Sequence, residues 1–107
     1  MSILIIDDFQ EERDLLFTIL NSAGFGPLLP VGTAREGLQL LGVGKRGKQT
    51  SGIDLVLMDI EMPEIDGLEA CQRIRMEDQL QNLPIIVITA HTEAKDIQAA
   101  YTCGATD

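Results

Sequence analysis

The sequence SILIIDD, residues 2–8, is a short apolar run that ends in two aspartates. Two later runs have the same form: IDLVLMD at residues 53–59 ends in a third aspartate, and PIIVITA at residues 84–90 ends in a threonine and an alanine. Each run has the length of a strand and is rich in Ile, Val and Leu without strict alternation, which is typical of parallel strands buried on both faces. We therefore expect each run to form a strand of one parallel sheet.

Polar side chains follow these runs where the predicted strands end, namely Asp7, Asp8, Asp59 and Thr89. In an open parallel sheet, ligands bind in the crevice at the carboxyl ends of the strands. Three carboxylates gathered there repel one another and destabilise the fold unless a cation is bound. Because Mg²⁺ prefers carboxylate oxygens, waters and phosphate, the pattern predicts a magnesium site at this edge.

The segments between the runs carry helix signals. Residues 10–23 have apolar positions at helical spacing and are followed by Gly24, which is typical of a helix end. Capping boxes at Thr33 and Asp66 predict two more helices, and residues 93–103 predict a fourth that Gly104 ends. A short strand at residues 28–31 contains a proline, which favours an edge position. The alternation of strands and helices predicts an α/β fold with helices on both faces of a parallel sheet.

Length and composition limit the class of protein. The chain has 107 residues, which predicts one domain, residues 1–107, and 45% of them are hydrophobic, which excludes a disordered chain. The 17 acidic residues outnumber the 8 basic ones, and the net charge of −9 argues against direct binding of nucleic acid. No apolar run has membrane-spanning length, and Met1 leads directly into the first strand without room for a signal peptide. We expect a cytoplasmic protein without membrane contact.

The two cysteines, Cys71 and Cys103, do not have the spacing of metal ligands. Both fall on predicted helices, so we expect them to be small buried apolar residues without a disulfide.

The stretch DIEMPEIDG, residues 59–67, contributes the most specific pattern, because a Met-Pro turn directly follows the carboxylate of Asp59. Together with Asp7-Asp8, Thr89-Ala90 and the sequence GATD at residues 104–107, it resembles the receiver domain of two-component response regulators. The resemblance implies a flavodoxin-like, doubly wound parallel sheet with strand order 2-1-3-4-5.

The resemblance also implies a function, that of a phosphoacceptor switch in two-component signal transduction. Asp59 would receive a phosphoryl group from a phosphohistidine of a sensor histidine kinase or a histidine phosphotransfer protein. Thr89 would bind the phosphoryl group and move when it arrives, and the backbone amide of Ala90 would contact another phosphoryl oxygen. Such a domain is not an ordinary enzyme, although it takes part in its own phosphorylation and dephosphorylation.

The metal ligands that the resemblance implies are the carboxylates of Asp7, Asp8 and Asp59 together with the backbone carbonyl of Glu61. The cofactor would be Mg²⁺, which supplies the charge neutralisation that three carboxylates cannot supply.

The chain departs from the family pattern in one respect. Receivers carry a lysine at the end of a fifth strand, and that position would fall beyond Asp107. We therefore expect strand order 2-1-3-4, with the fifth strand and helix missing, and slower phosphorylation in the absence of the lysine. An uncovered edge on the fourth strand, residues 84–89, would favour a non-native dimer.

Several alternative interpretations fit parts of the sequence. Residues 42–48 fit G-x-x-x-x-G-K, but they follow a predicted helix and Gln49 takes the place of Ser or Thr, so an exposed loop is favoured. His91 could be a general base or a residue that tunes access to the phosphoryl group. A phosphatase of the haloacid dehalogenase type would need Asp-x-Asp-x-Thr, which residues 59–63 lack. A receiver-like interaction module that is not phosphorylated is the remaining alternative.

Overall fold

The computed structural model describes residues 2–43, 52–59, 67–77 and 80–88. Four strands and three helices alternate along these residues: β1 (Ile3–Ile6), α1 (Gln10–Ser22), β2 (Leu28–Val31), α2 (Ala34–Leu41), β3 (Leu55–Asp59), α3 (Gly67–Arg75) and β4 (Ile85–Ile88). Several expectations concern residues outside these ranges. They are the loop at 44–51, Glu61, Asp66, Thr89, Ala90, His91, Cys103, the helix at 93–103 and any cover on the outer edge of β4 by residues 89–107.

The four strands form one parallel sheet in the order β2-β1-β3-β4. Strands β1 and β3 take the centre, where all four residues of β1 and three of the five residues of β3 are buried. Strand β2 lies at an edge, as its Pro30 predicts, because proline cannot donate a hydrogen bond to a further strand. The predicted α/β fold and strand order are confirmed.

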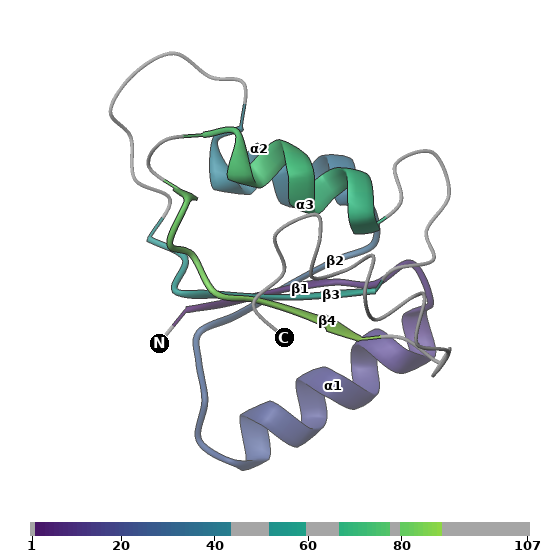
Figure 1. Cartoon of the computed structure of the whole chain (residues 1–107). Coiled ribbons are helices and arrows are strands. Elements are labelled where there is room, and N and C mark those ends of the chain that lie inside the picture. The colour runs from purple at the N-terminus through teal and green to yellow at the C-terminus, as the bar shows by residue number, and fades with distance from the viewer. Residues whose placement is uncertain (1, 44–51, 60–66, 78–79, 89–107) are drawn as a thin grey trace.

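Helices cover both faces of the sheet. Figure 1 shows α1 below the sheet and α2 and α3 side by side above it. The side chains of β1 and β3 divide accordingly, because successive residues of a strand point to opposite faces. Leu4 and Val56 join the larger apolar core under α2 and α3, whereas Ile5 and Leu57 face α1.

Helix α1 packs through a narrow stripe. Leu16 and Leu20 are half-buried against the smaller apolar cluster of β1 and β3, while Ile19, at a neighbouring helical position, is 55% exposed. The helix ends as predicted, since Gly24 follows its last turn with φ of +88°, a conformation that favours glycine.

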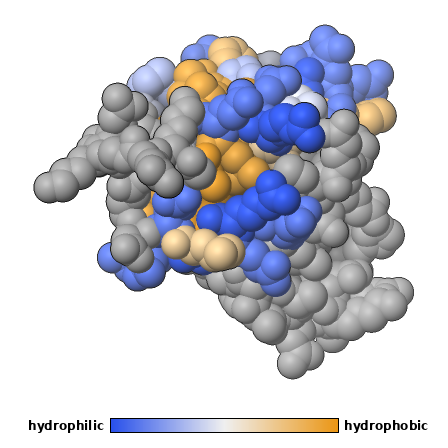
Figure 2. Space-filling model, turned by 90° about the horizontal axis from the view of Figure 1, so that it is seen from above, coloured by the Kyte–Doolittle hydropathy of each residue, from blue (hydrophilic) through white to orange (hydrophobic). Residues whose placement is uncertain are grey.

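Helices α2 and α3 bury broader apolar faces. Thr33 begins α2 as its N-cap, with its hydroxyl accepting a hydrogen bond from the backbone N–H of Glu36 at 3.1 Å, which confirms the predicted cap. Leu38 of α2 and Cys71 and Ile74 of α3 are buried, so the expected burial of Cys71 is confirmed. Figure 2 views this side of the molecule and shows a patch of apolar residues between polar ones. Among the described helices, none combines the length and apolar character needed to span a bilayer.

Candidate functional site

Asp7 and Asp59 meet at the carboxyl edge of the sheet because the two central strands are in register. Ile6 is the partner of Met58 across β1 and β3, so Asp7, which follows β1, and Asp59, which ends β3, come next in the same register. On the other side of β3, Asp59 is the partner of Ile88. Thr89 is the residue that follows Ile88 in the sequence, although its own position lies outside the described residues.

Asp7 is hydrogen-bonded to Phe9, Val31 and Arg13. Its side chain is buried, with the residue only 2% exposed, and its carboxylate accepts a hydrogen bond from the backbone N–H of Phe9 at 2.9 Å. Its backbone N–H donates to the carbonyl of Val31 on β2, and its own carbonyl accepts from Nη1 of Arg13 at 2.7 Å. The carboxylate therefore sits against the first turn of α1, where the helix dipole favours negative charge.

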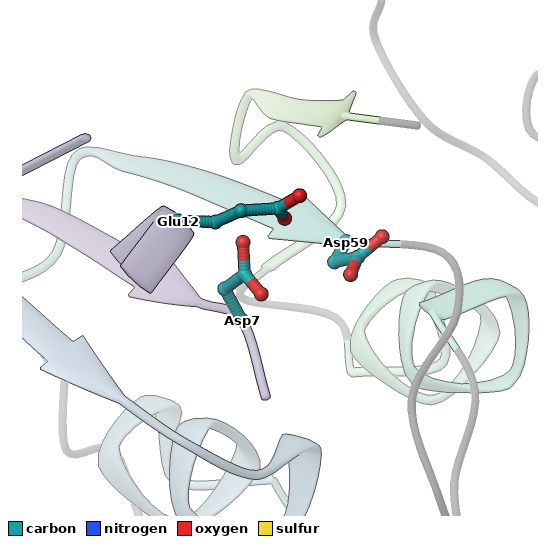
Figure 3. Close-up of side chains that lie close together, drawn as sticks. All are labelled: Asp7, Glu12 and Asp59. Carbon is teal, nitrogen blue, oxygen red and sulfur yellow. The ribbon is translucent and has the colours of Figure 1, made fainter. Parts of the chain in front are cut away.

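A third carboxylate reaches this edge from α1. Glu12 lies in the first turn of the helix, and Figure 3 shows its side chain extended toward Asp7 and Asp59. One carboxylate oxygen from each of the three residues lies within 4.8 Å of the other two. Asp7 is buried, Asp59 is half-buried and Glu12 is exposed, so the cluster opens to solvent on the side of the helix.

The negative charges at this edge influence one another. The pKa of Glu12 is raised above its ordinary value, first by a side-chain hydrogen bond with Asp7 and by the charge of Asp7. Desolvation and the charges of Asp59 and Asp8 raise the pKa of Glu12 further. Neighbouring carboxylates of this kind favour a proton or a cation between them.

The donor set suits a small divalent cation. Mg²⁺ binds oxygen ligands at about 2.0–2.1 Å, so two oxygens on one ion lie about 3 to 4 Å apart. The spacing in this cluster, within 4.8 Å, therefore requires only a small contraction for all three carboxylates to share one ion. The residues present fit the magnesium that the sequence predicts.

The structure brings together only part of the predicted residue set. Asp7 and Asp59 lie in the cluster, whereas Asp8 is exposed and does not belong to the three-carboxylate group found among the described residues. Glu61, Thr89 and Ala90 lie outside the described residues.

Glu12 is the residue that the sequence analysis did not assign to the site. An acidic residue in a first helical turn is commonly explained by the helix dipole, and that explanation gives no reason to place Glu12 beside Asp7 and Asp59. The available signal was the short connection, since α1 begins only three residues after Asp7. The first turn of such a helix must lie beside the end of the strand that precedes it.

Comparisons with known proteins agree with this geometry. The family model of the response regulator receiver domain matches residues 3–107. The CAI-1 autoinducer sensor kinase/phosphatase CqsS of Vibrio cholerae is 37% identical over 106 residues, which cover 98% of this chain and 14% of the relative. The chemotaxis protein CheY-3 of Vibrio cholerae is 33% identical over 104 residues, which cover 97% of this chain and 75% of the relative.

Solved structures show the same architecture. The chemotaxis protein CheY4 of Vibrio cholerae superimposes with a TM-score of 0.84 at 26% identity, covering 98% of this chain and 81% of that one. The sheet order, the paired strand-end aspartates and the family match over residues 3–107 all lead to one assignment. The chain belongs to the response regulator receiver domain family.

Proposed function

We propose that this domain is a phosphorylation-dependent switch of a two-component system, with Asp59 as the phosphoacceptor. The observation that carries the proposal is the position of Asp59. It ends the central strand β3, is half-buried, and lies beside the buried carboxylate of Asp7. A nucleophile there is accessible to a partner and is placed by the rigid centre of the sheet.

The reaction transfers a phosphoryl group from a phosphohistidine to Asp59. A carboxylate oxygen of Asp59 forms a bond to phosphorus while the bond between phosphorus and the imidazole nitrogen of the donor breaks. The electron pair of that bond stays on the imidazole, which takes up a proton, and Asp59 becomes an acyl phosphate. Positioning and charge neutralisation dominate the catalysis of such transfers.

Asp7, Asp8, Asp59 and the carbonyl of Glu61 are the proposed ligands of Mg²⁺. When bound, the ion would supply positive charge that stabilises the oxygens of the transferring group. Asp7 contributes a carboxylate whose position is set by the N–H of Phe9. Thr89 and Ala90 are proposed to bind phosphoryl oxygens through a hydroxyl and an amide, a placement that the pairing of Asp59 with Ile88 supports.

The phosphoryl donor is proposed to be a sensor histidine kinase or a histidine phosphotransfer protein. Relatedness to a sensor kinase and to a chemotaxis protein supports this class of partner. The family match favours a switch over the haloacid dehalogenase alternative. An interaction module that is not phosphorylated is the alternative that the experiment below excludes or establishes.

The test is phosphorylation of the chain by acetyl phosphate with Mg²⁺, followed by intact mass measurement. We expect the mass of one phosphoryl group to be added to the wild-type chain and none to the Asp59→Asn variant. Asp54→Asn is the matched control, because Asp54 immediately precedes β3 and so lies at the end of the strand opposite to Asp59. There its carboxylate accepts a hydrogen bond from the backbone N–H of Ser2. A label that persists in Asp59→Asn, or a wild-type chain that takes no label, would contradict the proposal.

A further inference from the structure

We infer that Glu12 is a metal-binding residue of this site, adding a carboxylate from α1 to those of Asp7 and Asp59. The inference rests on the proposed function, which supplies the cation. The proposed ligands Asp7 and Asp8 directly follow β1, and Asp59 ends β3. Glu12 would add a side-chain ligand that comes from a helix. The inference also predicts that cation binding ties the start of α1 to the phosphorylation site.

The first observation is geometric. Glu12 presents a carboxylate oxygen within 4.8 Å of an oxygen of Asp7 and of Asp59, so the three could bind one ion with little movement. Figure 3 shows the three side chains close together, with Glu12 coming from α1, Asp7 from the end of β1 and Asp59 from the end of β3. Its neighbour Glu11, also in the first turn, is not a member of this group among the described residues.

The second observation is that hydrogen bonds to Asp7 fix the helical turn that carries Glu12. The N–H of Phe9 donates to the carboxylate of Asp7 at the start of the helix, and Arg13, the residue after Glu12, donates from Nη1 to the carbonyl of Asp7. The first turn of α1 is therefore attached to Asp7 on both sides of Glu12. A ligand on a fixed turn loses less conformational freedom when it binds an ion than one on a free loop.

The third observation is electrostatic. Three carboxylates whose oxygens lie within 4.8 Å of one another repel when all are charged. A cation in the cluster would relieve these repulsions, and Glu12 would strengthen its binding.

Isothermal titration calorimetry of the wild-type chain with MgCl₂ tests the inference. We expect Glu12→Gln to weaken Mg²⁺ binding about tenfold or more, which is the range for loss of a group that supports a metal site. Glu11→Gln removes the same charge from the adjacent position. It should leave the affinity unchanged within about twofold, because salt largely screens an exposed charge that does not contact the ion.

Glu12→Asp separates contact from charge. This variant keeps the charge but shortens the side chain by one methylene, so a direct ligand should lose affinity much as Glu12→Gln does. Wild-type affinity in Glu12→Asp, or equal losses in Glu11→Gln and Glu12→Gln, would overturn the inference.

A wild-type chain without measurable Mg²⁺ binding would overturn it as well. Phosphoryl labelling of the same protein samples, measured by mass, separates this result from a failure of the proposed function. Labelling that depends on Asp59 but is accompanied by unchanged Mg²⁺ affinity in Glu12→Gln would reject Glu12 alone. Circular dichroism of each variant checks that the fold is retained.

Discussion

Replacing Gly37 with alanine should destabilise the domain, because α2 lies against β1 at this residue without space for a methyl group. A Cβ built at position 37 would collide with Cδ1 of Ile6 and would lie 2.8 Å from its Cγ1, with Cδ2 of Leu4 at 3.6 Å. Both residues are 0% exposed, so neither can move into solvent. Either α2 must shift away from the sheet or the side chain of Ile6 must change its conformation.

Two opposing contributions set the change in the free energy of unfolding for Gly37→Ala. Forcing an extra methyl into a packed core typically costs about 1–3 kcal/mol. Alanine in place of glycine within a helix gains about 1 kcal/mol. The contact is tight and involves fully buried aliphatic groups, which places it toward the upper half of the first range. We expect a net loss of about 1–2 kcal/mol in the free energy of unfolding.

Urea denaturation followed by far-ultraviolet circular dichroism measures this loss, since the chain has no tryptophan to report by fluorescence. The midpoint should fall while the slope with urea stays constant, as expected when stability changes without a change in exposed area. Gln39→Ala is the matched control, because Gln39 is an exposed residue of the same helix and its replacement should change stability by less than about 0.5 kcal/mol.

A double-mutant cycle tests the contact itself. Ile6→Val removes Cδ1, the atom nearest the added methyl, at a cost of about 0.5–1.5 kcal/mol. In that background Gly37→Ala should cost about 1 kcal/mol less than in the wild type, which is a measurable coupling for residues in contact. A Gly37→Ala variant as stable as the wild type, or a cycle without coupling, would refute the reasoning.

The fold could be predicted from the sequence because its strongest signals are local. The apolar runs specify the two central strands, and Pro30 places β2 at the edge. The predicted boundaries differ slightly from the observed ones, since β3 begins at Leu55 and not at residue 53. At the start of this segment, the N–H of Asp54 donates to the carbonyl of Ser2 and its carboxylate accepts from the N–H of Ser2, a tertiary contact without a sequence signature.

The packing of α1 was less predictable. Helical spacing groups Leu16, Ile19 and Leu20 on one face, but only Leu16 and Leu20 pack against the smaller apolar cluster and Ile19 is largely exposed. Periodicity gives the direction of an apolar face and not its width, which depends on how the helix lies across the sheet.

The candidate site was predictable where strands determine it and less so where a helix does. Register brings Asp7 beside Asp59, and two parallel strands that both end in aspartate predict that meeting. Glu12 reaches the site because of the orientation of the first turn of α1 over the end of β1, and that orientation depends on contacts of Phe9 and Arg13 with Asp7. These contacts form only in the folded chain, and no local sequence pattern predicts them.

Two further predictions concern a helix cap and the metal site. Thr33→Ala should lower the free energy of unfolding by about 1 kcal/mol in urea denaturation, because it removes the acceptor for the N–H of Glu36, whereas Thr18→Ala on the exposed face of α1 should have little effect. An unchanged midpoint for Thr33→Ala would show that water replaces the cap without loss. Asp8→Asn should raise the melting temperature in the absence of Mg²⁺ and abolish the rise that Mg²⁺ causes in the wild type, because it relieves repulsion at the site and removes a proposed ligand. Melting curves with and without MgCl₂ test the role of Asp8. Asp8 is exposed and stands apart from the three-carboxylate cluster of the described residues. An undiminished response to Mg²⁺ in Asp8→Asn would therefore leave Asp7, Glu12 and Asp59 as the carboxylates that bind the ion.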